Sequence, residues 1–257
     1  MAWWPFAGRA FLDPDDEAWQ IESWRWFLDR FGGVHDIMQS KLVLPTREFF
    51  PPTDQAGHGR AEHIFQHVKR LARMPDWPCQ LIEQPRRAEL RVADLGALKP
   101  VRSQPAGTFG FVGNEAVISY EPSAIDNPGQ LIATLAHELA HYRLANLREN
   151  APGGEELHEF TTDLMTVYLG FGVFGASAAF NFSQYQDTMS QGWQWSRHGY
   201  LSQRAWLFAL AIFLALTGKP FEQLRSYLKP HLMTDLSKAV GYVGRNRIAE
   251  RITSSAA

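Results

Sequence analysis

The sequence has little cysteine, no marked excess of charge and no long apolar run. Its one cysteine, Cys79, excludes an internal disulfide and any zinc site built from several cysteines. The 25 Lys and Arg oppose 27 Asp and Glu, so a net charge of −2 gives no indication of a nucleic-acid or anionic membrane partner. We therefore expect neither nucleic acid nor membrane among its partners.

Two apolar segments come closest to a membrane span. Residues 164–180 are interrupted by three glycines, and residues 205–216 number only twelve, whereas a transmembrane helix needs about 20 residues. The first residues lack the basic region and apolar run of a signal peptide. The chain also lacks the glycine-rich phosphate-binding motifs and the GxSxG nucleophile motif. These absences predict a cytoplasmic protein, with a membrane-associated form as the alternative.

Aromatic residues, in contrast, are abundant. There are 9 Trp, 17 Phe and 7 Tyr, and five of the nine Trp lie within the first 26 positions (Trp3, Trp4, Trp19, Trp24 and Trp26). An apolar fraction of 45% with 20% charged residues predicts a folded chain with a substantial core.

Hydrophobic spacing and helix-capping signals predict a mainly helical chain with a few strands. Helices are expected over residues 14–31, 61–74, 128–147, 155–169, 200–217 and 220–228. Strands are expected over 42–44, 80–83 and 89–92, with a hairpin over 108–120 that turns at Gly113-Asn114. The helix from Pro128 has an explicit start, because Asn127 suits the N-cap position and proline suits the first helical position.

The chemistry-bearing motif is His137-Glu138-Leu139-Ala140-His141, an HExxH sequence inside the long predicted helix. Residues four apart share a helix face, so His137 and His141 can offer two imidazole nitrogens to one ion. Zn²⁺ accepts such ligands at about 2.0–2.1 Å. Glu138 lies about 100° round the helix from His137, so it is the candidate general base rather than a ligand.

A catalytic zinc site needs a third protein ligand. The histidine-based continuation of metzincins is absent, because Leu144 and Leu147 stand in its place. On the following helix Glu159 and Asp163 are four residues apart and share a face, so one of them can bind the metal while the other orients a ligand histidine. His158 is the rival ligand, although it points about 100° away from Glu159.

This combination resembles the gluzincin-type zinc metallopeptidases, in which HExxH is completed by ExxxD on the next helix. The resemblance implies that His137, His141 and Glu159 bind one zinc ion. It further implies that Glu138 is the general base and that Asp163 is the hydrogen-bond partner of a ligand histidine.

A wider likeness, to bacterial zincin-like proteins without an assigned activity, rests on residues 44–46, 49–51, 133–136, 162–164 and 199–202. Together the resemblances imply an α+β, zincin-like fold that is mainly helical, with a small mixed sheet over the HExxH helix. They imply a single domain over residues 1–257. Its parts would be a Trp-rich helix and strand (1–45), a small α/β part (46–127), a helical metal-binding part (128–244) and a flexible tail (245–257).

The resemblance also implies a sheet edge that holds an extended peptide, and we expect Ala116–Tyr120 to be that edge strand. No clear counterpart of the family's oxyanion stabiliser is present. His198 and Tyr200 are the candidates, and an ordinary loop before a helix is the alternative.

A second histidine pair, His63 and His67 with His58 nearby, could hold another metal ion. We favour an exposed helical face, because no third ligand is evident. Cys79 is expected to be a buried structural thiol.

The sequence thus predicts a zinc-dependent peptidase that acts on a peptide or protein substrate, with its oligomeric state left open. The alternatives are a non-catalytic binding or scaffold protein stabilised by zinc and a membrane-associated metallopeptidase. The aromatic segments are expected to pack around the two metal-binding helices, leaving the Trp-rich N-terminus as packing or a partner surface.

Overall fold

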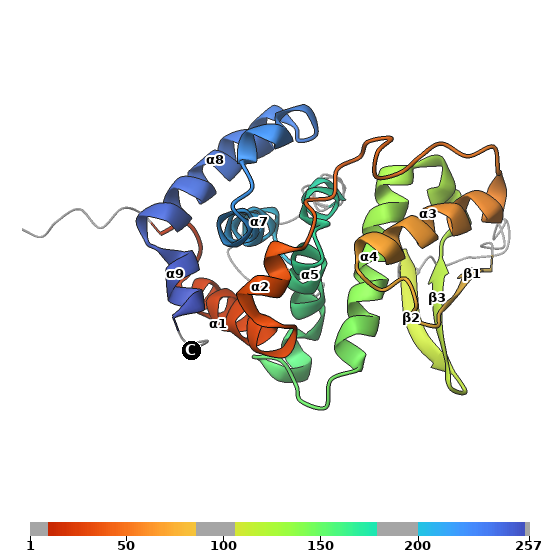
Figure 1. Ribbon diagram of the computed structural model, residues 1–257, viewed down its shortest axis with the longest axis horizontal. Helices are drawn as coiled ribbons and strands as arrows, with labels where there is room; N and C mark the ends of the chain where they lie inside the picture. The colour runs from red at the N-terminus through yellow and green to blue at the C-terminus, as the bar shows by residue number, and fades with distance from the viewer. Residues whose placement is uncertain (1–9, 86–105, 179–199, 255–257) are drawn as a thin grey trace, which may run out of the picture. The chain divides into compact units, whose positions relative to one another are not determined.

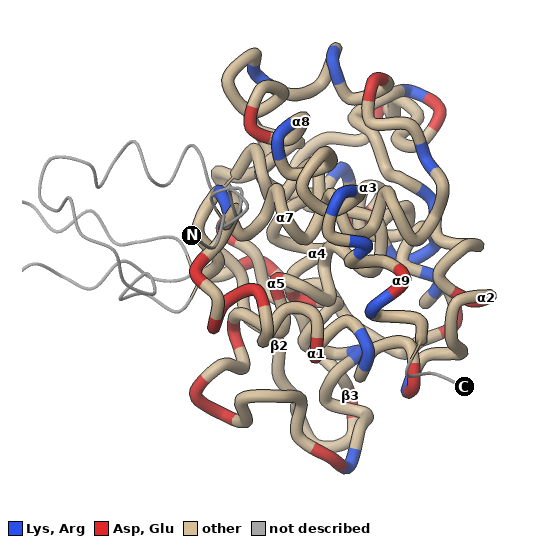
Figure 2. The backbone as a smooth tube through the Cα atoms, turned by 90° about the vertical axis from the view of Figure 1, so that its left-hand side faces the viewer, with Lys and Arg blue, Asp and Glu red and all other residues tan. Residues whose placement is uncertain are grey.

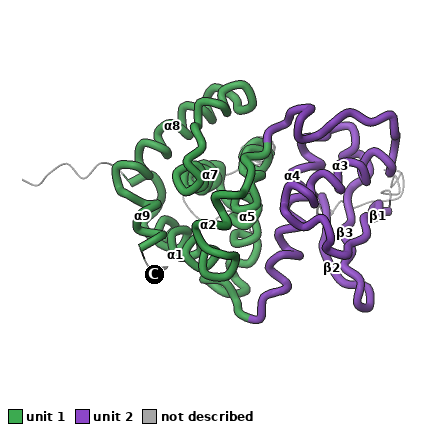
Figure 3. The backbone as a smooth tube through the Cα atoms, in the orientation of Figure 1, with its two compact units in different colours: residues 1–43, 149–257 green, residues 44–148 purple. Residues whose placement is uncertain are grey.

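The computed structural model describes residues 10–85, 106–178 and 200–254. The chain forms two compact units, one from residues 1–43 with 149–257 and the other from residues 44–148 (Figure 3). The expectation of a single domain stays a prediction.

The unit of residues 44–148 is a small α+β structure (Figure 1). Its elements are α3 (Gly57–Leu71), β1 (Gln80–Glu83), β2 (Gly107–Val112), β3 (Glu115–Tyr120), η2 (Pro122–Asp126) and α4 (Pro128–Ala145). The sheet order is β1-β3-β2, and α3, β2 and β3 all contact α4. A small mixed sheet therefore packs on the helix that carries HExxH, which confirms the predicted fold class.

The predicted hairpin is confirmed, but the predicted position of its second strand at the edge of the sheet is not. β2 and β3 pair antiparallel from Gly107↔Tyr120 to Val112↔Glu115, and Gly113 takes the positive φ of 62° that the tight turn requires. β3 also pairs in parallel with β1. The expectation that Ala116–Tyr120 is an edge strand is therefore wrong, because both of its sides are hydrogen-bonded to neighbours.

The start of α4 follows from its sequence. The Asn127 side chain accepts a hydrogen bond from the backbone N–H of Gln130 at 3.3 Å, and Pro128 occupies the first turn. Such a cap satisfies one of the backbone donors that every helix leaves free at its start.

The unit of residues 1–43 and 149–257 is built from helices around α7. Its elements are α1 (Pro14–Arg30), α2 (Gly33–Met38), η3 (Gly154–Leu157), α5 (His158–Tyr168), α7 (Gln203–Thr217), η4 (Phe221–Ser226), α8 (Pro230–Arg245) and α9 (Ile248–Thr253). Almost every side chain of α7 is buried. Helices α2, α5, α8 and α9 contact it (Figure 1). A short apolar helix of this kind is a core helix.

The aromatic residues of α1 pack against α5. Trp19 lies edge-on to Phe160 with ring centroids 6.3 Å apart, and Trp24 and Phe27 lie 6.0 and 5.6 Å from the Tyr168 ring. This confirms that the N-terminal helix packs on the helix that bears Glu159. Trp3 and Trp4 lie outside the described residues.

Some expected elements differ. Residues 42–44 are not a strand, although Val43 donates its backbone N–H to the Gly170 carbonyl at 3.0 Å. The helix expected over 220–228 is the shorter 3₁₀ helix η4, Phe221–Ser226, rather than an α-helix. The expected flexible tail from residue 245 instead contains α9, which buries Ile248 and Ile252. The strand expected over 89–92 lies outside the described residues.

Figure 2 marks the charged residues along the backbone, and at three helix ends these charges match the helix dipole. Acidic residues occupy the first turn of α1, and basic residues close α3 and α8 (Asp15, Asp16, Glu17, Lys69, Arg70 and Arg245). Carboxylates at helix N-termini and cations at C-termini are the stabilising arrangement.

Within residues 10–85, 106–178 and 200–254, no helix combines the length and the apolarity that a bilayer span requires.

Candidate metal centre

The two histidines of the HExxH sequence converge on one point. On α4 their Nε2 atoms lie 3.1 Å apart, and the rings of His137 and His141 are nearly perpendicular, with centroids 4.7 Å apart. Two nitrogens bound to one tetrahedral zinc ion at about 2.0–2.1 Å are about 3.3 Å apart. The pair therefore fits two corners of a single metal site.

Glu159, in the first turn of α5, completes a three-residue group. One ligand atom each from His137, His141 and Glu159 lies within 4.8 Å of the other two, and all three residues are half-buried. In the described part of the chain, no other set of three His, Cys, Asp or Glu meets this condition. The group is able to hold one metal ion, and two imidazoles with a carboxylate are donors that suit zinc among other transition metals.

The rival ligand His158 is not part of this group. Its place at the very start of α5 puts it one residue before Glu159, so their side chains leave the helix about 100° apart. The three-residue group thus contains the carboxylate of Glu159 and not the rival His158.

Glu138 lies beside the group without belonging to it. Its side chain is 5% exposed, and its Oε1 atom lies against β2 at Gly107, 3.0 Å from where a Cβ atom on that glycine would stand. This position of the carboxylate, beside Gly107 of β2, agrees with the prediction that Glu138 is not a metal ligand. Its role as general base stays a prediction.

Asp163 is buried four residues after Glu159, at 2% exposure. Its Oδ2 atom accepts a 2.8 Å hydrogen bond from the backbone N–H of Leu201. A buried carboxylate requires such donors. Leu201 is a partner that sequence reasoning missed, because no pattern links positions so far apart, and the predicted bond to a ligand histidine stays a prediction.

The structure describes one of the two oxyanion candidates and not the other. His198 lies outside the described residues. Tyr200 is described and is 39% exposed, immediately before Leu201. Its proposed role stays a prediction.

The second histidine pair does not build a three-residue group in the described ranges. His63 donates through Nε2 to the Pro51 carbonyl at 3.1 Å, and Arg70 donates to Nδ1 of His67. Burial lowers the pKa of His67, and the charges of Arg70 and His63 lower it further. This supports the reading of a partly exposed helical face. His58 instead bonds through Nδ1 to the Tyr120 hydroxyl at 3.1 Å.

Cys79 is half-buried, and burial raises its pKa to about 11. The neutral thiol is therefore the form present at ordinary pH. The side chain is half-buried rather than buried as expected.

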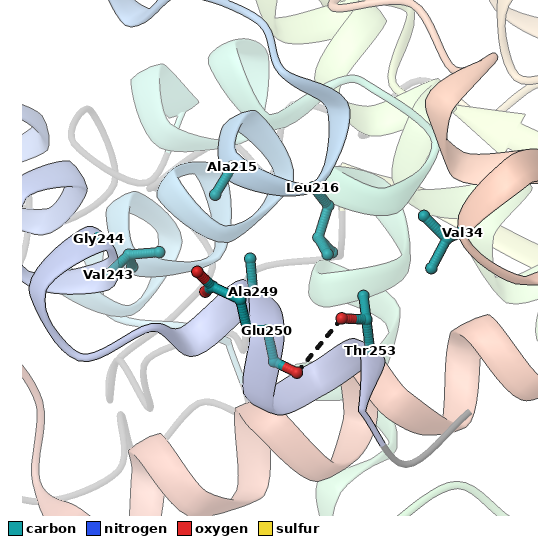
Figure 4. Close-up of a pocket in the computed structure, with 8 residues that line it drawn as sticks. All are labelled: Val34, Ala215, Leu216, Val243, Gly244, Ala249, Glu250 and Thr253. Carbon is teal, nitrogen blue, oxygen red and sulfur yellow. Dashed lines mark hydrogen bonds between the residues drawn. The ribbon is translucent and has the colours of Figure 1, made fainter. Parts of the chain in front are cut away.

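A pocket of about 370 Å³ lies in the unit of residues 1–43 and 149–257 (Figure 4). Its lining is largely apolar, including Val34, Leu216 and Val243, with one carboxylate from Glu250. Thr253 donates its hydroxyl to the Glu250 carbonyl at 3.3 Å. The lining has no histidine or cysteine, so of the donor types found in the metal centre this pocket offers only a carboxylate.

Comparison of the chain with models of protein families, with curated proteins and with solved structures found no match. Its fold and site define an α+β protein with a candidate His-His-Glu metal centre. The arrangement is consistent with a zincin-like site.

Proposed function

We propose that this protein is a zinc-dependent hydrolase, and specifically a peptidase of the gluzincin type. The observation that carries the proposal is the convergence of His137, His141 and Glu159 within 4.8 Å, on a helix whose sequence is HExxH. Three protein ligands leave a fourth position open, as in catalytic rather than structural zinc sites.

The chain's own residues would divide the work. Zinc, when bound, is a Lewis acid that lowers the pKa of a water molecule and polarises a carbonyl. Glu138 accepts the proton of the attacking water and passes it to the leaving amine. Asp163 holds the neighbourhood of Glu159 in place, and Tyr200 or His198 donates to the developing oxyanion.

β2 is the better candidate for pairing with an extended peptide. Among the described strands it lies at an edge of the sheet and packs directly on α4. An edge strand offers free main-chain donors and acceptors along its outer side. Peptide and protein substrates fit this geometry, and we expect the activity to reside in the cytoplasm.

The test is the metal content of protein purified without added zinc, measured together with peptide hydrolysis. Wild type should carry one zinc per chain, and His141→Ala should lose it. Glu138→Gln should keep zinc and lose about 10²–10⁴-fold in kcat.

His67→Ala is the matched control, because His63 and His67 are also four residues apart on a helix but find no third ligand among the residues that the structure describes. It should keep both zinc and activity. Zinc retained by His141→Ala would contradict the site. Zinc bound by wild type without turnover of any peptide would favour the non-catalytic, zinc-stabilised binding protein.

A further inference from the structure

β2 runs along α4 with one of its faces toward the helix. Phe109 stacks on the Tyr142 ring at 5.2 Å between centroids, and the Phe111 ring lies 6.1 Å from that of Tyr142. Alternate residues of a strand share a face, so Gly107 belongs to the same face as these phenylalanines. It meets α4 further toward the helix start, beside Thr134 and Glu138.

The space at Gly107 is already filled by its neighbours. A Cβ atom built there would lie 2.5 Å from Thr134 Cγ2, 3.0 Å from Glu138 Oε1 and 3.0 Å from the Ser119 carbonyl oxygen. Separations of this size are below the contact distance of about 3.5–4.0 Å for non-bonded atoms.

The three groups around Gly107 differ in how far they can move. Ser119 belongs to β3, whose main chain is bonded to strands on both sides. Its carbonyl is therefore held in place. The Thr134 methyl and the Glu138 carboxylate are ends of side chains on α4, and they are the groups that a new atom would push away.

We propose that Gly107 is a positioning residue for Glu138, because its missing side chain leaves the space in which the Glu138 carboxylate lies. This inference rests on the proposed function, in which Glu138 is the general base. It assigns to the edge strand a task beyond substrate pairing, namely setting the position of the base against the metal-binding face of α4.

The test compares Gly107→Ala with Gly110→Ala. Gly110 lies on the same strand, but a Cβ atom there meets nothing within 4 Å. Gly107→Ala should lower kcat by about 10²-fold, the effect of a displacement near 1 Å, with zinc affinity and KM unchanged. Gly110→Ala should match wild type in all three.

Crystals of each variant supply a readout that is independent of activity. The Glu138 carboxylate should be displaced in Gly107→Ala and unmoved in Gly110→Ala. An unmoved carboxylate, or a wild-type kcat in folded Gly107→Ala, would overturn the proposal.

A double variant separates positioning from packing. Thr134→Ser removes the methyl that makes the closest contact and leaves Glu138 in the way. Gly107→Ala/Thr134→Ser should therefore recover the melting temperature and keep the low kcat, while Thr134→Ser alone stays near wild type. Full recovery of kcat, or failure of both Gly107 variants to fold, would make Gly107 a packing residue only. If Glu138→Gln itself kept full activity, the proposed function would fail instead.

Discussion

The carboxylate of Asp163 accepts a hydrogen bond of 2.8 Å from the backbone N–H of Leu201, 38 residues further along the chain. The bond ties α5, which carries Glu159, to the residue that precedes the N-cap Ser202 of α7. Loss of the carboxylate would leave the Leu201 N–H without this acceptor. The loss would be costly because the bond is buried.

Replacing Asp163 with alanine should lower the free energy of unfolding by about 1–3 kcal/mol, the cost of leaving a buried donor unsatisfied. Urea unfolding in the presence of a chelator measures this apart from metal binding. Asp235→Ala removes an exposed partner of Lys238 and should cost at most about 1 kcal/mol. Equal losses in the free energy of unfolding would show that the buried Asp163 bond contributes no more to stability than an exposed ion pair.

Trp24→Ala should lower the free energy of unfolding by about 3–5 kcal/mol, because the side chain is fully buried between Phe27 and Tyr168. Trp26 is half-buried on the same helix, so Trp26→Ala should cost less. Below the melting temperature both variants should still bind zinc. Loss of zinc from folded Trp24→Ala would connect the aromatic cluster to the metal centre itself.

Gly170→Ala should be among the most destabilising single changes in the unit that contains it. Gly170 has a φ of 97°, and a Cβ atom there would lie 2.0 Å from the Lys41 carbonyl oxygen. Gly218 also has a positive φ, 67°, but a Cβ atom there meets nothing within 4 Å. Gly218→Ala should therefore cost only the backbone term of about 1–2 kcal/mol.

Thermal unfolding of the two glycine variants gives the comparison. Gly170→Ala should melt well below Gly218→Ala, and equal melting temperatures would mean that the backbone near Lys41 moves aside freely.

Cys79 should react slowly with iodoacetamide in the folded protein. Burial raises its pKa from 9.0 to about 11, so the thiolate fraction near pH 8 falls by about 100-fold. The rate, followed by mass spectrometry, should still be rising with pH above 10, and it should increase sharply at pH 8 when urea unfolds the chain. A plateau below pH 10 in the folded state would contradict the raised pKa.

Metal removal should lower the stability of wild type. A ligand that binds only the folded chain adds about 2.7 kcal/mol at a concentration of 100 Kd. Addition of zinc to chelator-treated protein should therefore raise the melting temperature, and His141→Ala should show no rise. A response of equal size in His141→Ala would place the metal elsewhere.

Local signals in the sequence were enough to predict much of the candidate metal centre. The Asn127-Pro128 start and the HExxH spacing place His137 and His141 on one helix face, because helix periodicity alone determines that relation. The strands at 80–83 and 108–120 and the helix α1 were likewise predicted from short patterns. Val43 shows the limit of such patterns, since a short apolar run bonded to a single carbonyl resembles a strand in sequence and is not one in space.

The order of strands could not be read from the chain. The alternation in Ala116–Tyr120 is the same whether the strand lies at an edge or in the centre, because its pattern records which face is buried and not how many neighbours it has. No local pattern indicated a role for Gly107, because such patterns do not record which residues of other elements lie beside it. The need for a glycine there comes from a helix side chain that is distant in sequence.

By itself the sequence determined the HExxH motif and the helix that presents its two histidines, since both depend on residue type and on a spacing of four. Only the tertiary structure decided that Glu159 rather than His158 completes the group, that β3 is central, and that Gly107 faces Glu138. These are relations between elements, and they depend on how buried faces pack together, which no local pattern specifies.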